Sequence, residues 1–208
     1  MGNEIYTIGR EFGSYGRQVG EVLAKRLGIN FYDKELLQRA AKDSGFCEEI
    51  FENHDEKPTN SFLYSLVMDT YSASSMATAP FLDMPLNHKV FLAQFDAIKS
   101  LAEQESCVIV GRCADYALAD KPNVVNVFIR ADLEDRIKNV SKRLDISNNK
   151  AKDLCHKKDK QRSSYYNYYT SKKWGESRSY DLCINLSKIS IDDAVDMIIS
   201  YKKNMKKI

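Results

Sequence analysis

Short apolar runs alternate with amphipathic stretches in the first part of the chain. Glu4 to Ile8 predicts a buried strand, and Gly16 to Leu27 repeats apolar side chains at helical spacing, which predicts an amphipathic helix. Gly28 follows as the expected C-terminal cap of that helix. Ile29 to Tyr32 predicts a second strand, and Asp33 stands where the N-cap of a further helix is expected. This strand, helix, strand, helix order is typical of a parallel sheet with crossover helices.

The middle of the chain interrupts this order, and the order then resumes. Residues 54–85 are rich in Ser, Thr, Asp and Pro and carry one short amphipathic patch, which indicates a helical insertion. A long helix with one apolar face is predicted from Asn87 to Glu103. Three more strands and a last helix that opens with a capping box complete the prediction: Cys107 to Val110, Val124 to Ile129, Leu182 to Asn185, and the helix that begins after Ser190 with Asp193 at its third position.

The length and the composition fit one α/β domain. The chain has 208 residues, of which 43% are hydrophobic, and this is enough for one sizeable core. We expect a core of about residues 1–53 and 105–208, a helical insert of about 54–104 and a lid of about 142–173 within the same domain.

Charge, cysteine and histidine usage exclude several classes of protein. A formal net charge of +2 argues against a dedicated nucleic-acid or membrane-surface protein, and no apolar run approaches the length of a membrane span. The five cysteines form no C-x-x-C pair and the three histidines have no metal-ligand spacing, so we predict neither a metal site nor a disulfide framework. The first residues lack a secretory signal, and we expect a reduced, cytoplasmic protein, for which a homo-oligomer stays open.

The loop between the first strand and the first helix carries glycines that suit a phosphate site. Gly13 and Gly16 allow the backbone N–H groups to turn inward, and the N-terminus of the following helix adds a positive dipole. Arg17 adds a planar guanidinium, which can contact phosphate through two hydrogen bonds. Compared with the pattern G-x-x-x-x-G-K-[ST], Arg17 replaces the lysine, Gln18 the hydroxyl residue and Glu11 the first glycine. The alternative is a glycine-rich turn that only packs.

Charged residues follow the other predicted strands, where parallel sheets bind ligands. Asp33 and Arg39 come after the second strand, Arg112 and Asp115 after the third, and Arg136 after the fourth. This set suits a phosphorylated substrate that also carries hydrogen-bond donors, such as a nucleoside monophosphate. Each residue also has a structural interpretation. Asp33 would be an N-cap, Arg39 would pair with Glu35, and Asp115 would neutralise Arg112.

The segment from Asp132 to Lys173 is helical in pattern and strongly basic. It is either a solvated helix face or a cationic lid over the phosphate loop. Four tyrosines beside Arg162 would either stack on a nucleobase or pack the lid against the core, and we favour packing: Tyr165, Tyr166, Tyr168 and Tyr169.

Five motifs together resemble the cytidylate kinase-like family, a divergent branch of the P-loop nucleoside monophosphate kinases. They lie after the first three predicted strands, in the lid and near the end of the chain: Gly9-Arg-Glu-Phe-Gly-Ser-Tyr-Gly-Arg17, Phe31-Tyr-Asp-Lys-Glu-Leu36, Val110-Gly-Arg-Cys-Ala-Asp115, Lys157-Lys-Asp-Lys-Gln-Arg-Ser-Ser-Tyr-Tyr166 and Tyr180-Asp-Leu-Cys-Ile-Asn185. The resemblance implies a three-layer α/β fold with a five-stranded parallel sheet, a helical insert over the monophosphate and an arginine-bearing lid. It also implies that Asp33, Arg39, Arg112 and Asp115 bind the pyrimidine nucleotide, and that Lys158-Asp159 with Arg162 matches the family's lid motif.

We therefore predict transfer of the γ-phosphoryl group of ATP to a nucleoside monophosphate, with CMP or dCMP as the expected acceptor. Mg²⁺ would be held by phosphates and water, and neither nucleic acid nor a membrane is an expected partner. The candidate site residues are Gly13, Ser14, Tyr15, Gly16, Arg17 and Gln18 for the donor phosphates, Asp33, Arg39, Arg112 and Asp115 for the acceptor, Arg136, Arg143, Lys158 and Asp159 in the lid, and Arg17, Lys160 and Arg162 for catalysis. Two alternatives stay open: a non-catalytic nucleotide or phosphate sensor, and a kinase of a non-nucleotide small molecule.

Overall fold

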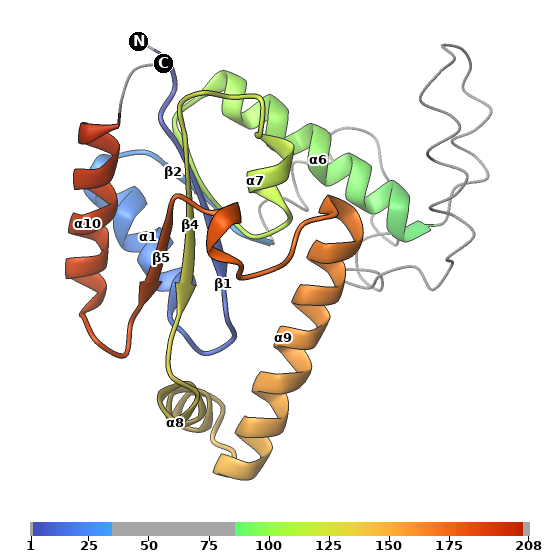
Figure 1. Cartoon of the computed structure of the whole chain (residues 1–208), viewed down its shortest axis with the longest axis vertical. Coiled ribbons are helices and arrows are strands. Elements are labelled where there is room, and N and C mark those ends of the chain that lie inside the picture. The colour runs from blue at the N-terminus through green and yellow to red at the C-terminus, as the bar shows by residue number, and fades with distance from the viewer. Residues whose placement is uncertain (1, 35–85, 206–208) are drawn as a thin grey trace.

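A parallel β-sheet forms the centre of the computed structural model, which describes residues 2–34 and 86–205 (Figure 1). In these residues the sheet has five strands in the order β2-β3-β1-β4-β5, and every neighbouring pair is parallel. The strands are β1 (Ile5–Arg10), β2 (Asn30–Tyr32), β3 (Cys107–Val110), β4 (Val124–Arg130) and β5 (Leu182–Asn185). The predicted five-stranded parallel sheet is confirmed.

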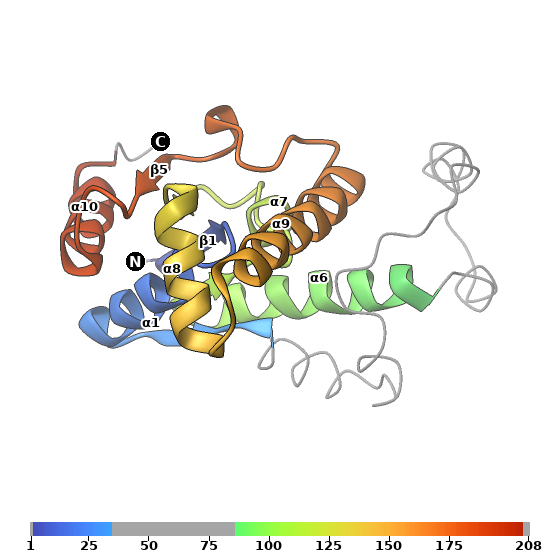
Figure 2. The same cartoon turned by 90° about the horizontal axis from the view of Figure 1, so that it is seen from below.

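Helices cover both faces of the sheet. The described helices are α1 (Gly16–Leu27), α6 (Leu86–Gln104), α7 (Ala114–Ala117), α8 (Leu133–Leu144), α9 (Asn148–Thr170), the 3₁₀ turn η1 (Ser177–Ser179) and α10 (Ile191–Asn204). Helices α1 and α10 lie on one face, and α6 and α7 lie on the other. Helices α8 and α9 lie near the carboxyl ends of the strands (Figures 1 and 2). The predicted three-layer α/β fold is therefore confirmed.

The alternation of side chains along the strands explains these two faces. In β1, Tyr6 and Ile8 pack into the cluster with α1 and α10, whereas Ile5 packs into the cluster with α6 and α7. In β3, Val108 belongs to the first cluster and Ile109 to the second. Successive side chains of a strand point to opposite faces, so a strand buried on both faces is apolar throughout.

The ends of the elements agree closely with the predictions, with one difference. Gly28 caps α1 in the left-handed region at φ 65°, and Ser190 and Asp193 form the predicted capping box of α10. Strand β1 continues to Arg10, two residues beyond the predicted Ile8, because it pairs with β4 along this whole length. This extension places the Arg10 side chain at the edge where the strands end.

The helix at residues 86–104 lies partly on the sheet. Ile98 and Ala102 of α6 pack in the cluster that includes Ile5 and Ile109 of the sheet. The sequence analysis assigns this helix to the helical insert of about 54–104. Because residues 54–85 lie outside the described residues, the proposed division stays a prediction.

The tyrosine-rich end of α9 packs against α6. The Tyr169 ring stacks on Phe91 with 4.0 Å between the ring centroids, and Tyr165 and Tyr166 are buried in the same cluster. This agrees with the packing interpretation of the tyrosines. Among the helices that the structure describes, none combines the length and the hydrophobicity that a membrane crossing requires.

Candidate functional site

The loop between β1 and α1 has the backbone expected of an anion site. Gly13 and Tyr15 both adopt left-handed conformations, with φ 82° and φ 62°. A Cβ atom on Gly13 would lie 2.8 Å from Val140 Cγ2 and 2.9 Å from the Arg136 carbonyl oxygen, so only glycine fits there. Within the described residues, the N–H groups of residues 13–16 donate to no protein acceptor. The first N–H groups of a helix attract anions, and the loop can therefore hold phosphate through its backbone.

The side chain of Ser14 stabilises the loop and does not face a ligand. It is fully buried, and its hydroxyl lies 2.9 Å from the Glu11 carbonyl oxygen and 3.2 Å from the Ile129 carbonyl oxygen. Ser14 can therefore contact phosphate only through its backbone N–H. Tyr15 is exposed at the N-cap of α1, and Gln18 is half-buried in the first turn.

Arg17 and Asp33, which we had assigned to the donor and the acceptor, form an ion pair with each other. Arg17 Nε and Nη2 lie 3.0 Å and 2.8 Å from Asp33 Oδ2, and Glu21 accepts a further hydrogen bond from Nη1. The hydrogen bond to Asp33 raises the pKa of Arg17, with Glu21 adding to the effect. The Arg17 guanidinium also lies 5.5 Å from the centre of the Phe31 ring. Arg17 therefore faces the end of β2.

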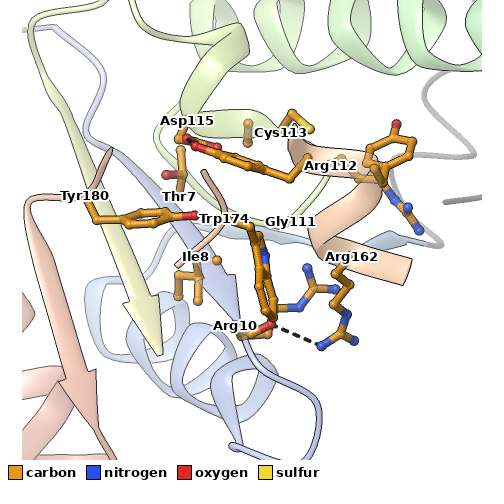
Figure 3. A pocket seen from close by; sticks show the side chains of 14 residues that line it. Thr7, Ile8, Arg10, Gly111, Arg112, Cys113, Asp115, Arg162, Trp174 and Tyr180 are labelled. Atoms are coloured by element: carbon orange, nitrogen blue, oxygen red, sulfur yellow. Dashed lines mark hydrogen bonds between the residues drawn. The ribbon is translucent and has the colours of Figure 1, made fainter. Parts of the chain in front are cut away.

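A pocket opens at the carboxyl ends of the neighbouring strands β1 and β3, against α9 (Figure 3). Its cavity volume is about 30 Å³. Its charged lining consists of three arginines and one carboxylate, and aromatic side chains complete the walls: Arg10, Arg112, Arg162 and Asp115, with Tyr165, Tyr166, Trp174 and Tyr180. Figure 3 shows Arg10 and Arg162 at one end of this pocket and Asp115 at the other. Arg112, Asp115 and Arg162 thus line the same pocket, and their roles in binding and catalysis stay a prediction.

Arg10 is a pocket residue that the sequence analysis missed. We had ended the first strand at Ile8 and treated the next residues as part of the glycine loop. The signal in the sequence is the arginine directly after Gly9, at the carboxyl end of a buried strand. Parallel sheets bind ligands at such ends, so this position was as good a candidate as Arg112.

Asp115 lies buried at the pocket wall with a hydroxyl partner. Tyr166 of α9 donates a hydrogen bond of 2.6 Å to Asp115 Oδ2. Burial raises the pKa of the Asp115 carboxyl, and the Tyr166 hydrogen bond partly opposes this shift. Arg112, also buried, belongs to a run of three positive φ angles, 79°, 58° and 55° at residues 111–113. This run turns the chain directly after β3, and strained backbone of this kind is concentrated at functional sites.

The basic helices contact the phosphate loop directly. Arg162 Nη1 donates a 3.2 Å hydrogen bond to the Arg10 carbonyl oxygen, and the guanidiniums of Arg162 and Arg143 lie 5.5 Å and 5.2 Å from the centre of the Phe12 ring. Lys160 is exposed and Lys158 is half-buried. Of these four lid cations, Arg162 lines the pocket.

Arg136 and Asp159 lie beneath the loop in a network of charges. Arg136 Nη1 forms an ion pair with Asp159 Oδ2, and its Nε lies 3.5 Å from Glu11 Oε2. The Phe12 N–H donates a 2.7 Å hydrogen bond to Asp159 Oδ1. Burial raises the pKa of Glu11, whose Oε2 accepts from the Ala131 N–H. We had assigned Arg136 and Asp159 to a lid facing the ligand, whereas here they join α8 and α9 to the phosphate loop.

Arg39, a predicted acceptor-binding residue, lies outside the described residues. Within residues 2–34 and 86–205, no three His, Cys, Asp or Glu side chains gather as a metal site.

Comparisons with known proteins fit this geometry. The uncharacterized protein from Eubacterium ventriosum ATCC 27560 is 34% identical, with a TM-score of 0.73 over 98% of this chain and 100% of that chain. Shikimate kinase from Bacteroides thetaiotaomicron (11% identity, TM-score 0.52, 96% of this chain and 98% of that chain) shares the fold. So does shikimate kinase from Acinetobacter baumannii in complex with shikimate (14% identity, TM-score 0.53, 99% and 97%). No curated protein matches the chain. The model of the cytidylate kinase-like family matches residues 5–188, and the chain therefore belongs to the cytidylate kinase-like family, with the fold of a small-molecule kinase.

Proposed function

We propose that this protein transfers the γ-phosphoryl group of ATP to a nucleoside monophosphate, with CMP or dCMP as the acceptor. The observation that carries the proposal is the pocket that Arg10, Arg112 and Arg162 line, beside the loop between β1 and α1. An anionic acceptor bound among them would lie close to a polyphosphate held by the loop N–H groups. The new bond forms from an acceptor phosphate oxygen to the γ-phosphorus, and ADP leaves with the bridging oxygen.

The positive charge of this pocket suits both the donor phosphate and the acceptor phosphate of the proposed reaction. Transfer of a phosphoryl group requires alignment of the two oxygens and neutralisation of charge, without covalent help from the protein. Guanidiniums in a partly buried pocket provide both, because each offers a planar pair of donors and stays protonated. Arg112 is only 5% exposed, which shields its charge from solvent and strengthens its attraction for an anion.

The loop supports the proposal that ATP is the donor and that Mg²⁺ has no side-chain ligand from this loop. The N–H groups of residues 13–16 would hold the phosphate chain. When bound, Mg²⁺ neutralises charge on the phosphates. The Ser14 hydroxyl donates its proton toward the carbonyl oxygens of Glu11 and Ile129, and Gln18 stands at the usual position of the hydroxyl ligand. This supports a metal held by phosphate oxygens and water.

The other end of the pocket supports recognition of a nucleobase. Asp115 and the Tyr166 hydroxyl offer hydrogen-bonding groups, and Trp174 and Tyr180 offer aromatic faces. A pyrimidine with an exocyclic amino group could donate to the Asp115 carboxylate while its ring contacts an aromatic wall. The resemblance to cytidylate kinases assigns the same role to Asp115.

A non-catalytic nucleotide or phosphate sensor is the second candidate, and two observations favour it. Arg17, in the place of the P-loop lysine, is paired with Asp33, and the carboxylate of Asp159 already accepts the Phe12 N–H of the loop. A sensor would bind nucleotides without turnover. A kinase of a non-nucleotide acceptor is the third candidate, since shikimate kinases share this fold.

An ADP-release assay separates these candidates. Purified protein with ATP and Mg²⁺ is tested against CMP, dCMP, UMP, AMP and shikimate, and calorimetry with the same compounds measures binding. We expect release of ADP with CMP or dCMP. Binding of nucleotides with no turnover for any acceptor would favour the sensor, and turnover with shikimate alone would favour the third candidate.

Arg162→Ala provides a residue-level test of the proposed kinase. Arginines placed at the transferring group contribute roughly 10³ to 10⁵ in rate in related systems. We expect phosphoryl transfer to fall by at least about a hundredfold, while nucleotide affinity stays largely intact. The measurement is kcat with CMP beside the dissociation constant of ATP. Unchanged turnover in this variant would contradict the assignment of Arg162.

A further inference from the structure

The Arg10 side chain runs from the first residue of α1 to the pocket, beside Gly111. Its Cβ lies under Gly16, the first residue of α1, and its guanidinium lies against Gly111, directly after β3. Arg10 also lines the pocket with Arg112 and Arg162 (Figure 3). One side chain therefore touches both parts of the proposed site, the N-terminus of α1 and the pocket itself.

Two glycines make the room that this side chain occupies. A Cβ atom on Gly16 would lie 2.5 Å from Arg10 Cβ, and one on Gly111 would lie 1.9 Å from Arg10 Nη1. Real Cβ atoms do not approach other atoms so closely, so both positions exclude any larger residue while Arg10 keeps this conformation. Gly111 has φ 79° as well, which again favours glycine. Gly16 therefore leaves room for the Arg10 Cβ, and the Arg10 guanidinium occupies the space beside Gly111.

The lid holds the backbone of the same residue. Arg162 Nη1 donates to the Arg10 carbonyl oxygen at 3.2 Å, so the second pocket cation is positioned by the main chain of the first. In contrast, the Arg17 guanidinium is bound to Asp33 Oδ2 through two nitrogens and to Glu21 through a third. Moving Arg17 to a phosphate would break these charge-assisted hydrogen bonds. The side chain of Arg10, in contrast to that of Arg17, lines the pocket.

We propose that Arg10 is the loop-side cation that binds the phosphate passing between donor and acceptor, the role first expected of Arg17. This inference rests on the proposed phosphoryl transfer and names the residue that neutralises the transferring group. The Arg10 guanidinium contacts the terminal phosphate of the donor chain, and Arg162 approaches the same phosphate from the lid.

Binding of inorganic tripolyphosphate tests the proposal without any turnover. Calorimetry compares wild-type protein with Arg10→Ala and Arg10→Lys, and with Arg178→Ala as the matched control. Arg178 is an exposed arginine of η1 that does not line the pocket. Hydrogen bonds to charged groups are strong, so we expect Arg10→Ala to weaken binding about tenfold to a hundredfold. Arg10→Lys should recover part of the loss, because a lysine restores the charge without the planar fork, and Arg178→Ala should match the wild type.

A double-mutant cycle with Gly111→Ala separates this role from a structural one. The added Cβ displaces the Arg10 guanidinium without changing its charge. Gly111→Ala should therefore weaken tripolyphosphate binding by itself, and should cause little further loss in the Arg10→Ala background. Thermal unfolding shows whether each variant is folded. If Arg10→Ala does not fold, tripolyphosphate binding by Arg10→Lys is compared with that of the wild type instead.

Three results would overturn the inference: unchanged tripolyphosphate affinity in Arg10→Ala, a larger loss in Arg17→Ala than in Arg10→Ala, or fully additive losses in the cycle. These results are independent of the kinase assay. A wild-type protein that binds tripolyphosphate through Arg10 but releases no ADP with any acceptor would leave Arg10 as the phosphate-binding residue and would overturn the proposed transfer.

Discussion

Removal of the Asp159 carboxylate should loosen the attachment of helix α9 to the loop between β1 and α1. Asp159 accepts the Phe12 N–H at 2.7 Å and forms an ion pair with Arg136, so its two oxygens join α9 to the loop and to α8. Asp159→Ala removes both interactions. Asp159→Asn keeps an acceptor for the Phe12 N–H and removes the charge.

The burial of the pair sets the size of the effect. The Arg136 and Asp159 side chains are 9% and 17% exposed, so solvent screens their attraction only weakly. Breaking a buried pair by removing one partner costs about 3–5 kcal/mol. Arg136 keeps Glu11 at 3.5 Å as a second partner, which places our expectation at the lower end, about 3 kcal/mol for Asp159→Ala. Asp159→Asn should cost about half as much, because one hydrogen bond remains.

Urea unfolding monitored by circular dichroism measures the free energy of unfolding of each variant. Asp153→Ala is the control, because Asp153 is an exposed aspartate on the same helix. Its replacement should change the free energy of unfolding by less than about 0.5 kcal/mol. If Asp159→Ala unfolds at the same urea concentration as Asp153→Ala, the carboxylate contributes nothing measurable and the argument from burial is refuted.

Two further predictions concern one buried acid and one helix cap. Burial raises the pKa of Asp115 above its ordinary 3.8, so the folded state binds the proton more tightly than the unfolded state. This contribution to stability is present below pH 3.8 and is lost as the pH rises through the folded pKa. Asp115→Asn, which stays neutral, should become more stable relative to the wild type as the pH rises through this window. Urea titrations at several pH values measure the difference, and a difference independent of pH would contradict the prediction. Gly28→Ala should lower the free energy of unfolding by about 1 kcal/mol, because alanine is strained in the left-handed region. No atom lies within 4 Å of the added Cβ, so the cost is conformational, and a smaller loss in Gly28→Asn would support that cause.

The local pattern of the sequence was sufficient to predict the strands and helices of the core and their order along the chain. The apolar runs at Cys107–Val110 and Leu182–Asn185 became strands β3 and β5 with the predicted bounds. Gly28 and Ser190 ended and began helices where they were expected. These features depend on residues that lie within a few positions of each other along the chain, so the sequence alone is enough to predict them. The sheet face that α6 covers depends on residues distant in the chain, and no local pattern predicts it.

Part of the site was also readable from the sequence. Arg112 and Asp115 follow a buried strand, so the general rule for parallel sheets placed them at the ligand edge, and both line the pocket. Arg10 was missed because the length of β1 is set by its pairing with β4, from Ile5 and Val124 to Arg10 and Ile129.

The sequence by itself determined which charged residues exist and which strand each one follows. Only the tertiary structure decided their partners. Arg17 stands in the lysine position but pairs with Asp33, sixteen residues away, while Arg136 pairs with Asp159 from the next helix. A long cationic side chain can reach several carboxylates, and which one it binds depends on how helices and loops approach each other in space. That approach is fixed by packing across the sheet, and no local pattern along the chain contains it.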